Sequence, residues 1–522
     1  MHKRIAPFLF FLLSANLVLA VSQSKEGLGF IDFSNSGSPK AQVHFQNGIL
    51  LLHSFEYEVA RQEFLKAQQI DPSFVLAYWG EAMTHNHPLW RYQNKEKALA
   101  VLNKLGENRD ARLEKASTER EKRYLATLEE LYCKESKLKC DRRYALSMQK
   151  LYQRYPEDLE AASFYSLAIL GTAQGVRNIR TYMKAASISE EVFARNPRHP
   201  GAIHYLIHSY DDPIHAPLGM RAARVYSEIA THSPHALHMP SHIFMAMGKW
   251  RDSVNSNTAS ARLALEQNNP NSAFHSLWWK HYSLLQMGRY EEAALIITNM
   301  YDLSLKYSST AARAHFCYMA AAQIMETKDW KSELLKNFDV SELPLKAHSS
   351  LLFTQGLQAI SQGLVDQALE IDRKLKALFK QKNYLEEDRT VALIMQKQLQ
   401  ASILFLLDQK VLALKHAHDA SKLQMQLATE FGPPVPMKPV FEFLGDLLLA
   451  KGEPQEAQTA YVESLRYNPG RSLSLLGIVN AAKETGDLSS LTQAVMQLQI
   501  NWRDGDSNLP ILPQIPPNNI SW

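Results

Sequence analysis

The stretch that decides the fold is KPVFEFLGDLLLAKGEPQEAQTAYVESLRYNPGR, residues 438–471. Gly445, Gly452, Ala457 and Pro469 fall at positions 8, 15, 20 and 32 of this 34-residue unit. Small side chains allow two helices to cross closely, and a proline ends a helix because it has no amide hydrogen to donate. The pattern predicts a helix, a tight turn and a second helix that packs against the first.

A second copy of the unit lies near the N-terminus, where Gly48, Ala60, Phe64 and Pro72 take positions 8, 20, 24 and 32. Two copies with one period are typical of a repeat protein. Both copies resemble the tetratricopeptide repeat (TPR), a helix-turn-helix unit. The resemblance implies an all-α fold, a TPR-like α-solenoid of about eleven or twelve helical hairpins that form a curved superhelix, with the first helices of the units lining a concave face.

The solenoid is expected to span residues 41–500 without a flexible linker. Residues 21–40 precede it, and residues 431–436, FGPPVP, cannot continue a helix and should form a rigid loop. The tail at residues 501–522 carries four prolines and should run extended, either loose or held along the surface. No segment alternates apolar and polar residues as a strand would.

The composition is that of an ordinary soluble globular chain. Of its 522 residues, 46% are hydrophobic and 21% are charged, which is too polar for a polytopic membrane protein. The net charge of +4 offers no basic surface for nucleic acid. We therefore expect no nucleic-acid partner and no integral membrane span in the mature chain.

The chain opens as a secretory signal peptide does. Lys3 and Arg4 precede an apolar run that ends at Ala20, shorter than the roughly 20 residues that cross a bilayer. We expect residues 1–20 to be cleaved and the mature protein to be secreted or periplasmic. The alternative for this run is an N-terminal membrane anchor.

The three cysteines do not form a redox motif. Cys133 and Cys140 are close enough in sequence to form a short disulfide loop in an oxidising compartment. Cys317, within AHFCYMAAA, is typical of a buried core thiol.

Histidines concentrate in one part of the chain, with eight of the 19 in residues 199–242. His204 and His208, and again His238 and His242, are spaced i, i+4, so the two rings of each pair share a helix face and can share a metal ion. The second pair follows the first by one 34-residue repeat, so both pairs occupy equivalent groove positions. We predict a metal site in the groove built from these four histidines, with the two pairs meeting at one point or at two adjacent points.

Other side chains within or near residues 199–281 are candidates for additional ligands, or for acceptors that orient the ligand rings. These candidates are His235, His215, His275, Asp211 and Asp212. The residues expected to line the groove or pocket are Trp278, Trp279, Trp79, Glu81 and His85. Whether the superhelix curls enough to bring His85 and Glu442 near the cluster is left open. The histidines without such partners are expected at the surface or in the core: His44, His53, His315, His348, His416 and His418.

Imidazole ligands without a thiolate suit copper, zinc, iron and nickel, and export favours copper or zinc, with iron possible. Three functions fit this pattern. The first is a scaffold without metal, whose concave groove holds a peptide, a small molecule or a protein partner. The second is a metal-dependent enzyme, an oxidoreductase or a hydrolase, and the third is a metal storage or delivery protein. The sequence has no HExxH, GxSxG or phosphate-loop motif, so catalysis is an open question.

The whole chain from about Val43 to Asp487 also resembles a family of exported TPR proteins. The resemblance is carried by WGEAMTHNHPLW (79–90), HYLIHSYDDPIHA (204–216), HALHMPSHIFMAMGKW (235–250), LWWKHYSLLQMGRY (277–290) and FGPPVPMKP (431–439). It implies the fold and a site in the groove, and it implies no reaction.

Overall fold

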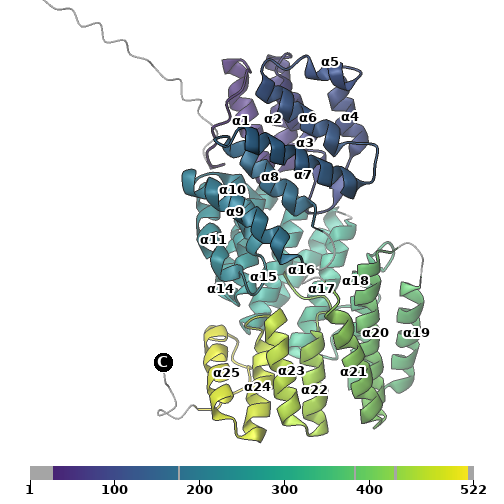
Figure 1. Ribbon diagram of the computed structural model, residues 1–522. Coiled ribbons are helices and arrows are strands. Elements are labelled where there is room, and N and C mark those ends of the chain that lie inside the picture. Colours follow the sequence, from purple (N-terminus) through teal and green to yellow (C-terminus); the bar gives the residue numbers. More distant parts are fainter. Residues whose placement is uncertain (1–26, 174–176, 308, 381–383, 428–431, 515–522) are drawn as a thin grey trace, which may run out of the picture.

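A computed structural model describes residues 27–514 apart from 174–176, 308, 381–383 and 428–431 (Figure 1). The described chain is almost entirely helical, as predicted, and consists of antiparallel helix pairs stacked along a superhelix. The predicted signal peptide, residues 1–20, and Phe431 of the predicted loop lie outside the described residues. None of the helices in the described ranges has the length and apolar character needed to cross a membrane.

Five helix pairs make up the N-terminal part. They are α1 Pro39–His53 with α2 Tyr57–Ile70, α3 Val75–Met83 with α4 Lys95–Asn103, α6 Glu119–Leu131 with α7 Lys137–Arg154, α8 Leu159–Gly171 with α9 Ile179–Arg195, and α10 Pro200–Tyr210 with α11 Ala216–Ile229. A short helix, α5 Arg109–Leu113, lies between the second and third pairs.

Six further pairs follow. They are α12 Pro234–His238 and α13 Pro240–Ala246 with α14 Trp250–Glu266, α15 Pro270–Gln286 with α16 Tyr290–Tyr307, α18 Leu345–Ser361 with α19 Val365–Phe379, α20 Glu386–Leu406 with α21 Lys410–Gln424, α22 Val440–Lys451 with α23 Pro454–Tyr467, and α24 Ser472–Thr485 with α25 Leu488–Asn501. Between two of these pairs, α17 Thr310–Thr327 stands alone, followed by a non-helical segment.

The repeat residues explain how neighbouring helices approach. A Cβ atom added to Gly445 or Gly477 would lie 2.8 or 2.4 Å from the ring of Tyr461, so the ring fits only against bare backbone. Phe64 occupies the same place in the N-terminal copy, where a Cβ on Gly48 would lie 2.6 Å from its ring. In both of these hairpins, an aromatic residue of the second helix packs on a glycine of the first helix, which fixes how the two helices pack.

The superhelix turns back on itself, so the middle of the chain contacts both ends. Helix α1 packs against α10, and the C-terminal helices lie against α14 and α15. The indole of Trp250 donates to the carbonyl of Gly470 over 3.1 Å, and the amide of Ser472 donates to the side chain of Gln286 over 2.9 Å. In Figure 1 the middle helices α10–α15 accordingly lie between the N-terminal helices above and α22–α25 below.

Two segments outside the helix pairs are held on the surface. In residues 27–38, the amide of Phe30 donates a hydrogen bond to the carbonyl of Arg198, and the side chain of Leu28 is buried. In the C-terminal tail, the amide of Asp506 donates to the carbonyl of Gly288 and its carboxylate accepts from the amide of Glu291, both over 2.9 Å. At Asp506, therefore, the tail is held against the turn between α15 and α16.

The link between α3 and α4 contains two antiparallel strands, β1 Asn86–His87 and β2 Tyr92–Gln93, which pair in one small sheet. This sheet does not change the all-α class of the fold. Strands of two residues are too short to show an alternating pattern in the sequence.

The cysteines lie as the sequence suggested. Cys133 and Cys140 form a disulfide with Cα atoms 5.6 Å apart, next to the start of α7. Cys317 is a free, fully buried thiol in α17.

Candidate metal centre

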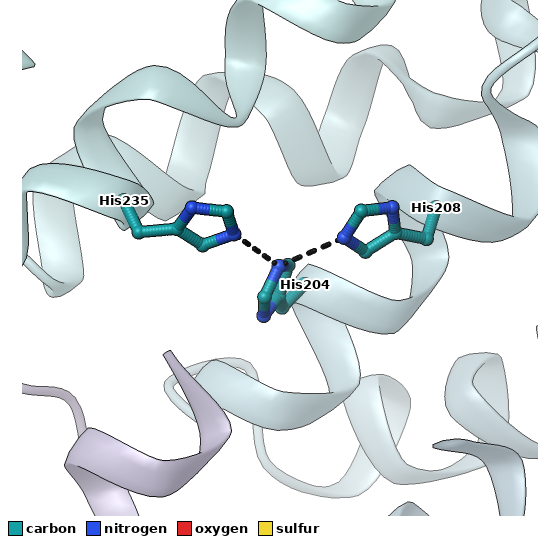
Figure 2. Close-up of side chains that lie close together, drawn as sticks. All are labelled: His204, His208 and His235. Atoms are coloured by element: carbon teal, nitrogen blue, oxygen red, sulfur yellow. Dashed lines mark hydrogen bonds between the residues drawn. The ribbon is translucent and has the colours of Figure 1, made fainter. Parts of the chain in front are cut away.

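Six histidines come together in two groups of three. The first triad is His204, His208 and His235, and the second triad is His238, His242 and His275. In each triad, one ring nitrogen of every residue lies within 4.8 Å of the corresponding nitrogens of the other two. Figure 2 shows the first triad, with His204 between the other two rings.

Each triad combines an i, i+4 pair with one histidine from the next repeat unit. His204 and His208 lie one turn apart on α10, and His235 comes from the first turn of α12 (Figure 2). His238 and His242 lie at the junction of α12 and α13, and His275 comes from α15. The four predicted histidines therefore lie at two adjacent points, which is one of the two arrangements expected, and the candidate additional ligands His235 and His275 each join one pair.

Three of the six rings have their Nδ1 hydrogen committed to an oxygen outside the triads. His204 donates to the carbonyl of His53 over 2.7 Å, and His238 donates to Oδ1 of Asn257 over 2.6 Å. His242 donates to the carboxylate of Asp211 over 2.5 Å. Such partners fix the tautomer of a metal-binding histidine and make its other nitrogen more basic. They leave the Nε2 lone pairs facing into the triads.

The Nε2 atoms meet at hydrogen-bond distance. Nε2 of His204 lies 3.1 Å from Nε2 of His208 and 3.1 Å from Nε2 of His235 (Figure 2). Since Nε2 of His204 has a single lone pair, at most one neighbour can donate a hydrogen to it well. In the second triad, Nε2 of His238 and Nε2 of His242 are likewise 3.1 Å apart. A shared cation is the partner that can accept all the lone pairs of a triad at once.

Burial keeps five of the six rings neutral, the form that binds metals. His204 is fully buried and 2% of His238 is exposed. Desolvation, with a smaller contribution from the neighbouring histidines, lowers the pKa of His204, His208, His235 and His275 well below the usual value. The same burial lowers the pKa of His238 to about 3. At neutral pH these five rings therefore have free lone pairs and no competing proton.

Aromatic side chains wall the triads. Trp279, which is 2% exposed, packs its ring 4.8 Å from His238 and 4.4 Å from His242, measured between ring centroids. The ring centroid of Phe55, from the N-terminal hairpin, lies 4.3 Å from that of His204. Trp278 is farther out, half-buried and stacked on Tyr318. Trp279, which was predicted to line the groove, thus packs directly against the second triad.

Three of the residues predicted as additional ligands or as groove lining belong to neither triad. His215 donates from Nδ1 to Asp212, whose carboxylate also pairs with Arg177 at 3.0 Å, and this group lies at the start of α11 outside both triads. Trp79 is fully buried and packs edge-on against Tyr124 and other core rings, so the prediction that it lines the groove was wrong. A tryptophan in an apolar run can pack in the core or line a groove, because its large side chain is favoured in both places. The sequence pattern is the same in the two cases.

Glu81 and His85 line a different cavity, of about 490 Å³, near the N-terminal hairpin. In that cavity Glu81 accepts from Lys104 over 3.1 Å. The wall of this cavity approaches the first triad, because Trp90, next to Tyr57 and His87, lies 5.9 Å from His235 between ring centroids.

Glu442 lies in a buried ionic cluster. Arg471 forms ion pairs with Glu442 and Glu326, both at 2.6 Å, and donates to the hydroxyl of Tyr282 over 2.9 Å. Tyr282 and His242 line one cavity of about 40 Å³. The superhelix therefore brings the Glu442 region close to the second triad without making Glu442 a member.

A third buried group was not foreseen. Glu160 accepts from His53 over 2.7 Å and from His199 over 3.0 Å, and all three are buried. Burial raises the pKa of Glu160, but the two histidines outweigh it and lower this pKa to about 2. The three residues come from α1, α8 and the start of α10, so no spacing in the sequence identifies them. His53 also supplies the backbone carbonyl that orients His204. The buried group of Glu160, His53 and His199 therefore holds in place a residue that positions the first triad.

Neither a protein-family model nor a curated protein matches the chain. Several solved helical-repeat structures resemble it weakly. Yeast Tom70 has 12% identity and a TM-score of 0.32, over 88% of this chain and 92% of that chain. The P58(IPK) TPR domain has 15% identity and a TM-score of 0.24, over 86% and 99%. The human IFIT1 dimer with m7Gppp-AAAA has 13% identity and a TM-score of 0.37, over 91% of both chains. The description of the fold therefore rests on the helix pairs of the chain itself.

Proposed function

We propose that this protein is an exported TPR-like solenoid that binds transition-metal ions, copper or zinc, at its two histidine triads. The observation that carries the proposal is the convergence of three Nε2 atoms in the first triad, with two distances of 3.1 Å to His204. Hydrogen bonds alone satisfy such an arrangement poorly, whereas a metal ion binds all three lone pairs.

The surroundings of the triads favour the same function. The carboxylate of Asp211 behind His242 forms the carboxylate–histidine arrangement that is common behind metal ligands. Neutral imidazoles suit copper and zinc, and iron also accepts them. Each triad offers three protein ligands, which is the number found in catalytic zinc sites that keep a position open for water or substrate. Structural sites are usually closed by four ligands, so the ligand count favours chemistry over storage.

Export is supported by two independent features. The apolar N-terminal run has the length and flanks of a signal peptide. The Cys133–Cys140 disulfide belongs to an oxidising compartment, since thiols in the cytosol are kept reduced.

The decisive experiment is elemental analysis of the untagged mature protein, beside a variant with both His204→Ala and His238→Ala. We expect stoichiometric copper or zinc in the wild type, loss of the metal in the double variant, and little change in helix content by circular dichroism. The matched control is His418→Ala, which removes an exposed histidine far along the chain and should retain the metal. Absence of metal from the wild type, even after reconstitution, would leave a scaffold whose groove binds a peptide or a protein.

A further inference from the structure

The two triads are related as copies of one repeat. His238 and His242 follow His204 and His208 by 34 residues each, and the third ligand of each triad comes from the next first helix. The same local geometry is therefore built twice, on successive units whose first helices are stacked side by side.

The copies also adjoin. The ring centroids of His208 and His242 are 5.8 Å apart, and those of His235 and His238 are 6.2 Å apart. Within the triads the ring centroids are closer, 4.8 Å apart for His204 and His208 and 5.0 Å for His238 and His242. The six rings thus form one continuous array with two centres. Two-metal sites likewise hold two ions in adjacent sets of ligands, about 3.5–4 Å apart.

The charge of the surroundings restricts the ions. Among the described residues, Asp211 is the one carboxylate that accepts from a ring of the triads, and no cysteine thiol belongs to either. A second buried carboxylate, Glu56, accepts from the backbone amide of His235 over 3.2 Å. Two divalent ions would bring four positive charges against these two carboxylates, which is costly. Two monovalent ions bring half that charge. Cu(I) is the monovalent ion that imidazoles bind, and it accepts three ligands without a fourth.

We propose, as a development of the metal-binding function above, that the two triads hold a pair of copper ions that acts as one centre and reacts with dioxygen. Each Cu(I) gives up one electron and becomes Cu(II), and one dioxygen molecule accepts both electrons and becomes peroxide. A cavity of about 40 Å³ lies beside His242 of the second triad and has room for about three water-sized molecules, which is enough for dioxygen. Trp250 and Tyr282 form part of its wall.

The experiment is an anaerobic titration of the mature protein with Cu(I) against a competing chelator, followed by exposure to oxygen. We expect two copper ions per chain, uptake of one dioxygen per two copper ions, and little Cu(II) signal in the electron paramagnetic resonance spectrum. The signal is lost because two Cu(II) ions that share a bridging ligand couple their unpaired electrons.

Variants of His235 and His275, the half-buried histidines that each triad takes from the next unit, test whether the two copper ions form a pair. His235→Gln and His275→Gln should each lose one of the two copper ions, and the remaining ion, oxidised to Cu(II) by added ferricyanide, should then give a full signal. His418→Gln should keep both ions and the silent spectrum. One copper ion per chain in the wild type, or two ions with a full Cu(II) signal from both, would overturn the pair while the metal-binding function stands. Failure of the wild type to bind copper at all would overturn the pair, and failure to bind any transition metal would overturn the proposed function as well.

Discussion

Nδ1 of His204 donates a hydrogen bond of 2.7 Å to the backbone carbonyl of His53, a residue 151 positions earlier in the chain. The bond joins α10 to the end of α1, so the N-terminal hairpin orients a ring of the first triad. A backbone carbonyl is present whatever the side chain, but it reaches His204 only because the first five helix pairs close into one turn. The site and the curvature of the solenoid are therefore coupled.

Asp211→Asn should weaken metal binding. The neutral amide is a weaker acceptor for the Nδ1 hydrogen of His242 than the carboxylate, so the Nε2 lone pair becomes less basic. We expect the affinity for copper or zinc to fall by roughly tenfold or more, measured by titration against a chelator. The matched control is Asp212→Asn, which changes the adjacent carboxylate outside the triads and should leave the affinity unchanged. Equal loss in both variants would contradict an orienting role for Asp211.

Trp279→Phe should reduce the quenching of protein fluorescence by Cu(II). Trp279 packs within 5 Å of two rings of the second triad, at 4.8 Å and 4.4 Å, and a bound Cu(II) ion quenches a nearby indole. Trp79→Phe is the control, because Trp79 lies in the N-terminal core against Tyr124. We expect the quenched fraction to fall in the first variant and to persist in the second. The reverse result would place the metal elsewhere.

His281 should make the metal-free protein less stable in acid. Its burial lowers its pKa from 6.5 to about 3. Between these two values the unfolded chain binds a proton that the folded chain does not, so the free energy of unfolding falls as the pH falls below 6.5. From pH 6.5 to pH 5 this one residue contributes a loss of about 2 kcal/mol. Urea unfolding with a chelator present should show a flatter pH dependence for His281→Gln, and an unchanged slope would argue against burial in the neutral form.

Arg471→Leu should destabilise the junction between the C-terminal helices and the middle of the chain. The guanidinium is fully buried between Glu326 and Glu442, so its removal takes the ion-pair partner from Glu326 and leaves Glu442 with Lys438 alone as a cationic partner. Breaking a buried ion pair costs about 3–5 kcal/mol. Arg466→Ala removes an exposed pair with Glu463 and should cost less than about 1 kcal/mol. Denaturant unfolding measures both, and similar midpoints would refute the structural role of Arg471.

Replacing both Cys133 and Cys140 by Ser should lower stability modestly and leave metal binding intact. A disulfide across seven positions restricts the unfolded chain by about 2 kcal/mol in the chain-entropy description. A reductant should lower the melting temperature of the wild type to that of the variant and should not affect the variant. A variant that is already as stable as the oxidised wild type would mean that the disulfide contributes nothing.

Much of the architecture could be predicted because its causes are local. The glycines at position 8 of each unit and the aromatic residue at position 24 determine how one hairpin packs, as the contacts of Gly48 with Phe64 and of Gly445 with Tyr461 show. The i, i+4 spacing and the 34-residue offset also follow from helix and repeat geometry. These rules placed His204, His208, His238 and His242 on equivalent helix faces.

The sequence by itself therefore determined the helix pairs, the repeat and the two histidine pairs, because each depends on residues less than one unit apart. Only the tertiary structure decided that His235 and His275 complete two triads, that His53 orients His204, and that Trp79 belongs to the core. Those contacts depend on the twist and curvature of the superhelix. Small rotations between successive units accumulate along a solenoid, and a single sequence does not record their sum.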